Sequence, residues 1–320
     1  MGLTWSMSSS LYPGPGEAHA GTVPISEELF AQVAPGIKLC YQTFGDPGGE
    51  PLLLVMGLGG QMTWWDPDLC AMLAERGFHV VRFDNRDSGR SSRVPGRVNR
   101  STLVRAFAGR RVRAPYSLSD MGDDGFGLLD HLGLESAHVV GVSMGGMIAQ
   151  TMAIARPHRV RSLTSMMSTT GKRTVGWQHP ALFPTLFGRG AGRQAYIDTS
   201  VRVWLRIGSE SYRLTEEEIR AHAAESFDRG VSASGTLRQM VAILTQPNRA
   251  PRLHGLRMPA LVIHGLADKM VHVSGGRATA TAIPGAELLL IDGMGHDLPP
   301  ALNQTFADGI ERTAKRASRK

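Results

Sequence analysis

The stretch "GVSMGGMIAQ" (residues 141–150) places a single serine, Ser143, between glycines at the point where an apolar run ends. The preceding run, "AHVVGV" (137–142), is rich in β-branched residues, and "MGGMIAQTMAIA" (144–155) is typical of a helix. A serine on a sharp strand-to-helix turn, in the pattern G-x-S-x-G, is typical of an exposed nucleophile. The flanking glycines keep such a turn free of collisions with neighbouring backbone. The remaining sequence decides between this interpretation and a loop hydroxyl in a glycine-rich chain.

Short apolar runs alternate with helical patterns from about residue 27 onward, which predicts βαβ units around a mostly parallel sheet. Most of these runs are nearly continuous in apolar residues, as expected for strands buried on both faces. Strands are predicted at 37–44, 51–56, 78–84, 137–142, 159–166, 259–264 and 286–292. Helices are predicted at 67–76, 119–132, 144–155, 274–282 and 300–316, with Ser119 and Pro299 as N-terminal signals. We therefore expect an α/β fold in which helices flank the sheet.

The alternation stops between residues 171 and 249, where helical segments bearing aromatic residues and arginines follow one another without a strand. The βα pattern resumes at 259, so this insertion belongs inside one fold rather than to a separate domain. We expect residues 23–170 and 250–320 to form the α/β core and residues 171–249 to form a helical lid. Residues 1–22, rich in Ser, Pro and Gly, are predicted to be a disordered tail.

Composition is ordinary for a globular chain with a sizeable core: of 320 residues, 42% are hydrophobic and 20% are charged. No apolar run approaches the roughly 18 residues that a membrane-spanning helix needs, so we expect a soluble protein. The N-terminal stretch lacks the basic and apolar segments of a secretory signal peptide, and we expect a cytoplasmic location. Cys40 and Cys70 lie in apolar stretches, which indicates two buried free thiols.

The net charge of +7 raises the question of a nucleic-acid partner. The arginines are scattered, however, and the one dense cluster, "RAFAGRRVRAP" (105–115), holds a single aromatic residue and no recognised motif. We interpret this cluster as a solvated basic loop and expect no nucleic-acid partner. The sequence has no H-E-x-x-H motif and no Cys/His cluster, so neither a metal nor another cofactor is expected.

A nucleophilic serine needs a base to remove its proton and fixed donors for the negative oxygen that forms on the substrate. Met144 supplies one N–H, because it begins the helix after the serine, where the helix dipole favours negative charge. A second N–H is expected from Leu58, in the glycine-rich loop that ends the run "LLLVMGLGGQ" (52–61). The same loop, followed by Asp84, faintly resembles a dinucleotide fingerprint, but Met62 stands where the third glycine is required.

The base and the acid that orients it are expected late in the chain, in the order serine, aspartate, histidine. Asp268 lies just beyond one predicted strand in "LVIHGLADKMV" (261–271), and His296 lies just beyond the next in "LLLIDGMGHDLP" (288–299). Neighbouring parallel strands end at the same edge of a sheet, so we expect both side chains to meet Ser143 there.

Other charged residues remain alternatives. Asp292 and Asp297 are neighbours of His296 in sequence and would strain to reach its ring, so Asp268 is preferred. Three further histidines are poorer bases, because they lie inside or before a strand end or away from a glycine turn: His254, His264 and His272. The stretch "FDNRDSGRSS" (83–92) also looks catalytic, but we interpret it as a loop held by internal hydrogen bonds and arginine pairs.

Taken together, these motifs resemble the α/β-hydrolase superfamily over about residues 35 to 310. The stretches that carry the resemblance are "LLLVMGLGGQMTWW" (52–65), "VVRFDNRDSGRSS" (80–92), "HVVGVSMGGMIAQ" (138–150), "PALVIHGLADKMV" (259–271) and "GMGHDLP" (293–299). Within the superfamily the chain looks most similar to actinobacterial carboxylesterases and lipases and to the aclacinomycin methylesterase group. Those proteins have a similar "MG" oxyanion loop and "GMGH" turn.

The resemblance implies a role for each candidate residue: Ser143 as nucleophile, Asp268 as acid, His296 as base, and Leu58 with Met144 as oxyanion donors. One departure is Met56, where many relatives carry the histidine of an HG pair. A serine at the nucleophile position argues against haloalkane dehalogenases and epoxide hydrolases, whose nucleophile is an aspartate.

We expect hydrolysis of a carboxylic ester, a small-molecule substrate, through an acyl-enzyme intermediate. The same three residues would serve a perhydrolase, a thioesterase or an acyltransferase, and a non-catalytic receptor on the same fold is a further alternative. Aromatic side chains indicate an apolar pocket and hence a neutral, fairly hydrophobic substrate. The expected substrate-binding residues are Trp64, Trp65, Trp177, Phe183 and Trp204.

Overall fold

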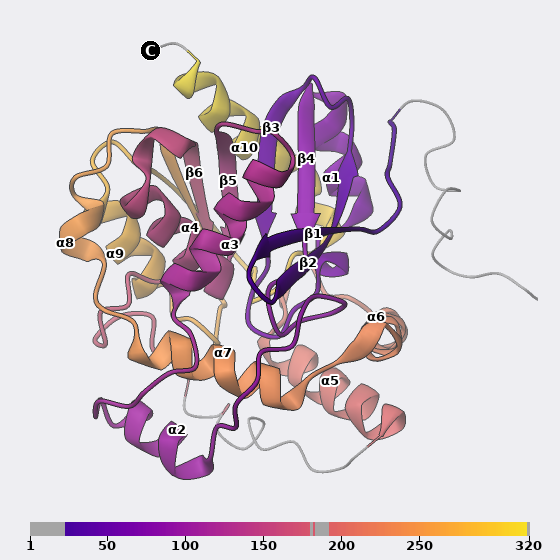
Figure 1. Ribbon diagram of the computed structural model, residues 1–320, viewed down its shortest axis with the longest axis vertical. Helices are drawn as coiled ribbons and strands as arrows, with labels where there is room; N and C mark the ends of the chain where they lie inside the picture. The colour runs from indigo at the N-terminus through magenta and orange to yellow at the C-terminus, as the bar shows by residue number, and fades with distance from the viewer. Residues whose placement is uncertain (1–22, 180–181, 183–191, 319–320) are drawn as a thin grey trace, which may run out of the picture.

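The computed structural model describes residues 23–179, 182 and 192–318. Its centre is a sheet with the spatial strand order β1-β2-β4-β3-β5-β6-β7-β8 (Figure 1). The strands are β1 Leu29–Ala34, β2 Ile37–Phe44, β3 Glu50–Val55, β4 Phe78–Phe83, β5 Ala137–Val142, β6 Val160–Met166, β7 Ala260–Gly265 and β8 Glu287–Ile291. β2 runs antiparallel to both of its neighbours, and every other pairing is parallel. The predicted α/β fold is confirmed.

Helices cover both faces of this sheet. The core helices are α1 Pro67–Glu75, α3 Leu118–His131, α4 Met144–Ala155, α8 Ala250–Leu253, α9 Ser274–Ala282 and α10 Asn303–Ala317. Leu52 and Leu54 of β3 pack in the layer of α1 and α10, whereas Leu53 and Val55 pack in the layer of α3 and α4. Successive strand residues point to opposite faces, so an uninterrupted apolar run fills both layers.

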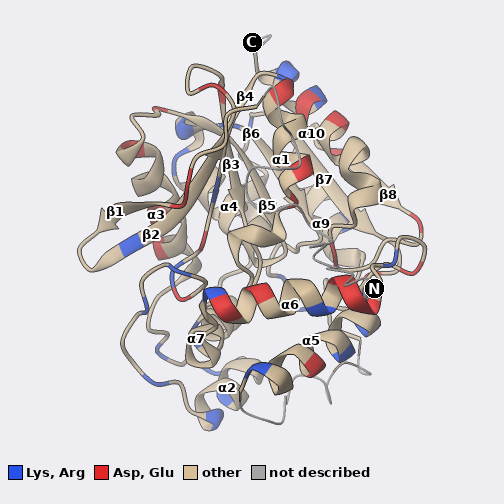
Figure 2. Cartoon of the chain, turned by 90° about the vertical axis from the view of Figure 1, so that its right-hand side faces the viewer, with Lys and Arg blue, Asp and Glu red and all other residues tan. Residues whose placement is uncertain are grey.

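Three helices inserted between β6 and β7 lie across the carboxyl ends of the parallel strands (Figures 1 and 2). They are α5 Arg193–Ile207, α6 Glu216–Gly230 and α7 Ala233–Thr245, and we call them the cap. A further helix, α2 (Arg100–Phe107), comes from the segment after β4 and packs against α7. The layer over the strand ends therefore includes a piece of chain from outside residues 171–249.

The sequence patterns predict most elements within two residues, and the misses have physical reasons. β1, α2 and α8 are not predicted, because each is short and buries a single side chain of its own against the core. The Ser119 signal is wrong: Ser117 caps α3, and its hydroxyl and the Asp120 carboxylate each accept a backbone N–H of the other residue. Pro299 precedes a 3₁₀ turn, Pro300–Leu302, rather than α10 itself.

Within the described residues, no helix is both long enough and apolar enough to cross a bilayer. Cys40 and Cys70 are buried and unpaired, as predicted. Burial raises the pKa of each thiol to about 12, so neither is a thiolate at neutral pH. The predicted tail, residues 1–22, lies outside the described residues, and the cytoplasmic location stays a prediction.

Candidate active site

Ser143 occupies a sharp turn between β5 and α4, with φ 56° and ψ −117°. Positive φ is rare for a residue with a side chain and stores backbone strain. A Cβ added to Gly145 would lie 2.0 Å from a carbonyl oxygen of β3, and one added to Gly141 would lie 2.1 Å from the Gly145 carbonyl oxygen. Only glycine fits at either position. The Ser143 N–H donates to the Met166 carbonyl at 2.9 Å, and the Ser168 hydroxyl donates to the Ser143 carbonyl at 2.8 Å.

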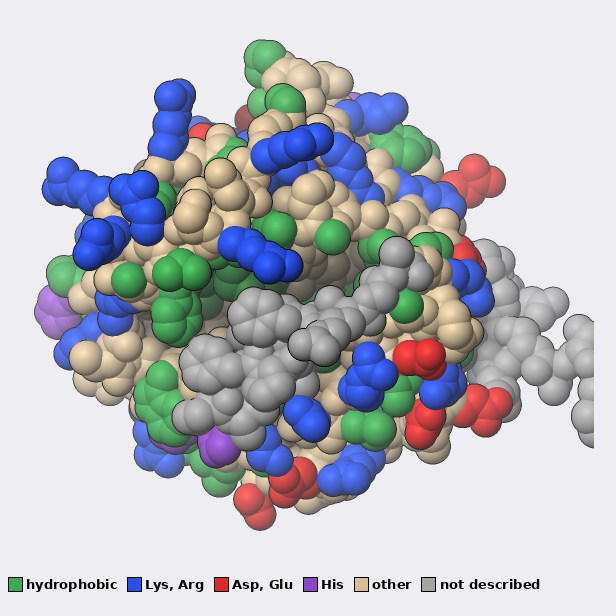
Figure 3. All heavy atoms as spheres, turned by 90° about the horizontal axis from the view of Figure 1, so that it is seen from below, with side chains coloured by type: hydrophobic (Ala, Val, Ile, Leu, Met, Phe, Trp, Pro, Cys, Tyr) green, Lys and Arg blue, Asp and Glu red, His purple; other side chains and the backbone are tan. Residues whose placement is uncertain are grey.

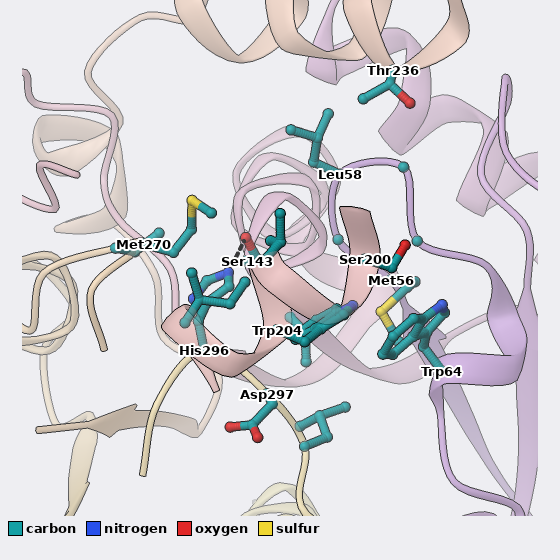
Figure 4. Close-up of a pocket in the computed structure, with 18 of the residues that line it drawn as sticks. Met56, Leu58, Trp64, Ser143, Ser200, Trp204, Thr236, Met270, His296 and Asp297 are labelled. Carbon is teal, nitrogen blue, oxygen red and sulfur yellow. Dashed lines mark hydrogen bonds between the residues drawn. The ribbon is translucent and has the colours of Figure 1, made fainter. Parts of the chain in front are cut away.

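The imidazole of His296 connects Ser143 to Asp268. Figure 4 shows the contact between His296 and Ser143. His296 Nε2 lies 3.0 Å from Ser143 Oγ, and His296 Nδ1 lies 2.8 Å from Asp268 Oδ2. The other carboxylate oxygen accepts the N–H groups of Met270 at 2.9 Å and Val271 at 2.8 Å, which fixes its orientation. With the Nδ1 proton donated to Asp268, Nε2 is placed to accept the serine proton.

The carboxyl group of Asp268 is buried and held in its ionised form. Burial alone would raise its pKa, but the facing rings of His296 and His264 bring the pKa down to about 2. A carboxylate in this state stabilises an imidazolium without taking up its proton.

The alternative residues lie in other surroundings. Asp297 accepts both the N–H and the hydroxyl of Ser209, at 3.0 and 2.5 Å, rather than contacting the ring of its neighbour. Asp292 is exposed. Among the histidines, His264 is buried with Nε2 at 2.8 Å from the Val271 carbonyl, His272 stacks on Trp177, and His254 is exposed. The structure thus brings together the residues that the sequence pattern prefers.

Both predicted oxyanion donors belong to segments beside the nucleophile. Met144 is the first residue of α4, so its N–H has no acceptor inside the helix. Leu58 lies next to Ser143 in Figure 4, in the loop that follows β3. That loop approaches so closely that a Cβ added to Gly57 would lie 3.2 Å from the Ser143 Cβ.

Two side chains outside the predicted site brace residues 56–60, which hold the expected donor Leu58 and which we call the oxyanion loop. Asn85 Nδ2 donates to the Met56 carbonyl at 2.8 Å, and Gln239 of α7 accepts the Gly59 N–H at 2.8 Å. These bonds hold the loop although Met56 replaces the histidine of many relatives. Asn85 had a detectable signal, since it directly follows a strand in the stretch 83–92, but Gln239 lies in a helix without a motif.

Ion pairs hold the charged loop 83–92, but the arginines that pair with its carboxylates come from cap helices and not from the loop itself, as the internal pairing expected from the sequence would require. Arg238 of α7 binds Asp87 through two N–H groups, at 2.7 and 2.8 Å. Arg229 of α6 lies 3.1 Å from Asp84. Both pairs join a cap helix to the core.

Ser143 and His296 face a cleft of about 3080 Å³ between the sheet and the cap (Figure 4). Trp64, Trp177 and Trp204 line this cleft, and the rings of Trp64 and Trp204 stack with their centroids 4.5 Å apart.

Of the other two expected substrate-binding residues, Trp65 does not join this wall. Trp65 is fully buried in the core layer of α1 and α10, so we leave it out of the substrate surface. Trp64 ends a short 3₁₀ turn and Trp65 follows it, and this sequence has no period that predicts which side chain faces inward. Phe183 lies outside the described residues.

Comparisons with known proteins agree with this architecture. Residues 50–299 match the family model of the alpha/beta hydrolase fold. The chain is 28% identical over 296 residues to rhodomycin D methylesterase DauP of Streptomyces sp. (strain C5), which covers 86% of this chain and 94% of that protein. It is also 28% identical over 285 residues to 2-hydroxy-6-oxononadienedioate/2-hydroxy-6-oxononatrienedioate hydrolase 2 of Pseudomonas putida, over 86% of this chain and 93% of that protein.

Among solved structures, the enol-lactonase from Burkholderia xenovorans LB400 superposes with a TM-score of 0.67 at 23% identity, over 91% of this chain and 100% of that chain. This likeness supports the fold alone. From the family match over most of its length, the chain belongs to the α/β-hydrolase fold family.

Proposed function

We propose that the chain is a serine hydrolase that cleaves carboxylic esters of neutral, fairly hydrophobic substrates through an acyl-enzyme. The observation that carries this proposal is the continuous series of contacts from Ser143 through His296 to the buried Asp268. Membership of the hydrolase family and the similarity to DauP, which is named as a methylesterase, support an ester as the bond that is cleaved.

In this mechanism His296 Nε2 removes the Ser143 proton while Oγ attacks the ester carbonyl carbon. The N–H groups of Leu58 and Met144 stabilise the oxyanion, and its collapse expels the alcohol, which takes the proton from the imidazolium. Water, deprotonated by the same ring, then attacks the acyl carbon and releases the acid. Asp268 keeps the ring in the required tautomer and stabilises its protonated form.

The wall of the cleft supports a substrate with little charge near the reacting bond. Trp64 and Trp204 stack on one side, and Met147 and Met270 also line the cleft. We propose that residues 171–249 act as a cap that keeps water from this wall while the acyl-enzyme persists.

Replacing the nucleophile tests the chemistry directly. Ser143→Ala should lower kcat for a nitrophenyl butyrate by about 10⁶-fold, because the triad acts as a unit. A fluorophosphonate should label the wild type and not this variant. Ser101→Ala, a change at an exposed serine, is the matched control and should leave both readouts unchanged. Labelling that survives Ser143→Ala would overturn Ser143 as the nucleophile. A wild type that neither turns over esters nor reacts with the fluorophosphonate would overturn the proposal and favour a receptor.

The substrate class is tested by nitrophenyl esters of increasing acyl length. The specificity constant kcat/KM should rise with the first added methylenes, because each buries apolar surface. Adding peroxide, alcohols or thioesters separates hydrolysis from perhydrolysis, acyl transfer and thioester cleavage by their products. A preference for charged acyl groups would contradict the apolar wall.

A further inference from the structure

A strongly basic surface lies beside the mouth of the cleft. Residues 88–119 contain eight arginines and no acidic residue. Two of these arginines are used inside the fold: Arg90 pairs with Glu28, and Arg93 donates to backbone carbonyls. The other six are exposed, and within the described part of the chain none has a carboxylate at ion-pair distance: Arg97, Arg100, Arg105, Arg110, Arg111 and Arg113. Part of the cluster interpreted as a loop thus belongs to α2.

Exposed apolar side chains lie among these arginines. Val104 and Phe107 of α2 are 68% and 54% exposed, and both lie at the rim of the cleft. Leu237 and Trp177, at 38% and 45% exposure, line the same cleft. Figure 3 shows basic side chains gathered on one side of this face, with hydrophobic side chains next to a hollow. In Figure 1, α2 stands at the lower edge of the molecule, in contact with the rest of the cap layer mainly through α7.

We propose that this basic-apolar rim, formed by the six exposed arginines with Val104 and Phe107, docks on the surface of an anionic lipid bilayer. An anionic surface attracts each nearby arginine with about 1 kcal/mol. Exposed aliphatic and aromatic side chains among such charges enter the boundary between headgroups and acyl chains. Docking through α2 turns the mouth of the cleft toward the lipid, where hydrophobic esters concentrate. The supply of esters to the cleft rests on the proposed function, whereas the docking does not.

The geometry favours a bilayer over other anionic partners. A small anion bound inside the cleft would leave the outward side chains of α2 uncovered. A nucleic acid would cover the arginines but leave the exposed Val104 side chain uncovered, and α2 offers only one aromatic ring for stacking. A bilayer satisfies both the charges and the apolar side chains.

The test is co-sedimentation with vesicles of phosphatidylcholine alone or with added phosphatidylglycerol. The wild type should sediment with the anionic vesicles at low salt, much less at high salt, and little with phosphatidylcholine alone. The combined variant Arg105→Gln, Arg110→Gln, Arg111→Gln and Arg113→Gln should lower the partition coefficient by about 1000-fold. Its hydrolysis of a dissolved nitrophenyl ester should match the wild type, which shows that the fold is intact.

Two further variants and the inactive enzyme make the result specific. A control with the same loss of charge near α8, α9 and α10 should bind as the wild type does: Arg252→Gln, Arg257→Gln, Arg277→Gln and Lys315→Gln. Val104→Ser with Phe107→Ser should weaken vesicle binding by about tenfold without changing its salt dependence. Ser143→Ala should bind as the wild type does, so a failure of the proposed chemistry is distinguishable from a failure of docking.

Several outcomes would overturn docking. One is sedimentation that does not depend on phosphatidylglycerol, or that is absent from both kinds of vesicle. Another is an equal loss of binding in the control with distant charges removed. Binding to a DNA duplex that exceeds vesicle binding and is insensitive to Val104→Ser with Phe107→Ser would assign the rim to nucleic acid instead.

Discussion

Two of the places where the cap contacts the core use different chemistry. At the first, which we call the histidine join, residues 207–211 after α5 contact the turn 293–297 that carries His296. At the second, the charged join, Arg229 and Arg238 pair with carboxylates of the loop 83–92. The first depends mainly on directional hydrogen bonds, with one exposed ion pair between Glu210 and Lys269 at its edge, and the second depends on buried ion pairs.

The histidine join is built from short backbone contacts. The His296 N–H donates to the Ile207 carbonyl at 2.7 Å, and the Gly295 N–H donates to the Ser209 hydroxyl oxygen at 3.0 Å. The Ser209 hydroxyl in turn donates to Asp297 at 2.5 Å. The two segments lie so close that a Cβ added to Gly295 would be 2.4 Å from the backbone of Gly208. The segment 207–211 therefore positions His296, the proposed base.

The charged join lies beside the loop 56–60, which carries the proposed donor Leu58. The side chains of Arg238 and Asp87 are 4% and 0% exposed, and Tyr116 adds a hydrogen bond to the same carboxylate at 2.7 Å. Gln239, the residue after Arg238, holds the Gly59 N–H of the oxyanion loop. A movement of the cap away from the core would therefore disturb the base at one join and the oxyanion loop at the other.

Breaking the ion pair of the charged join should have the largest effect on stability. Arg238→Met leaves the Asp87 carboxylate buried without its cation, which costs about 3–5 kcal/mol of the free energy of unfolding. Urea unfolding measures this loss. Arg193→Gln removes an arginine from an exposed pair with Asp228 and should cause no measurable change. Equal losses in both variants would show that burial does not distinguish the two pairs.

Loosening the oxyanion loop should have the next largest effect. Gln239→Met removes the acceptor of the Gly59 N–H, so the Leu58 donor shifts and kcat should fall by about 100-fold. The KM for a nitrophenyl ester should change little, because the wall of the cleft is intact. A rise in KM at constant kcat would instead place Gln239 in ground-state binding.

At the histidine join, Ser209→Ala should produce a smaller loss. The Gly295 N–H loses its acceptor and Asp297 loses a donor, so His296 is less firmly held and kcat should fall by about tenfold. Ser209→Thr keeps the hydroxyl and should restore most of the rate. If alanine and threonine give the same rate, the hydroxyl has no positioning role.

Sequence motifs point to the proposed catalytic residues because each of them follows a strand: Ser143, Asp268 and His296. They do not point to the two joins. Ser209 and Gln239 belong to cap segments whose sequence carries no motif, and their partners lie 86 and 180 residues away. Such contacts follow from how the cap docks, which local patterns do not encode.

The smallest expected effects are on the pH dependence of stability, which should have opposite signs for Asp87 of the charged join and Asp297 of the histidine join. Burial would raise the pKa of Asp87, but hydrogen bonds from Arg238 and Tyr116 hold it below the ordinary value of 3.8. Its stabilisation is therefore complete above the unfolded-state pKa and is lost as the pH falls through the folded-state value. Burial raises the pKa of Asp297, and the hydrogen bonds from Ser209 offset this only in part. The contribution of Asp297 is complete below 3.8 and is lost as the pH rises through the raised value.

Replacing each carboxylate by its isosteric amide turns this contrast into a measurement. Asp87→Asn, which tolerates the φ of 71° at this position, should cost a constant free energy of unfolding near neutral pH and progressively less in acid. Asp297→Asn should behave in the opposite way, gaining stability relative to the wild type as the pH rises above the ordinary carboxyl value of 3.8. Urea unfolding from neutral pH into acid gives both difference curves. Neutralising a buried carboxylate raises the free energy of unfolding only where the carboxylate lacks a cation. Difference curves whose slopes against pH have the same sign would therefore contradict this contrast between Asp87 and Asp297.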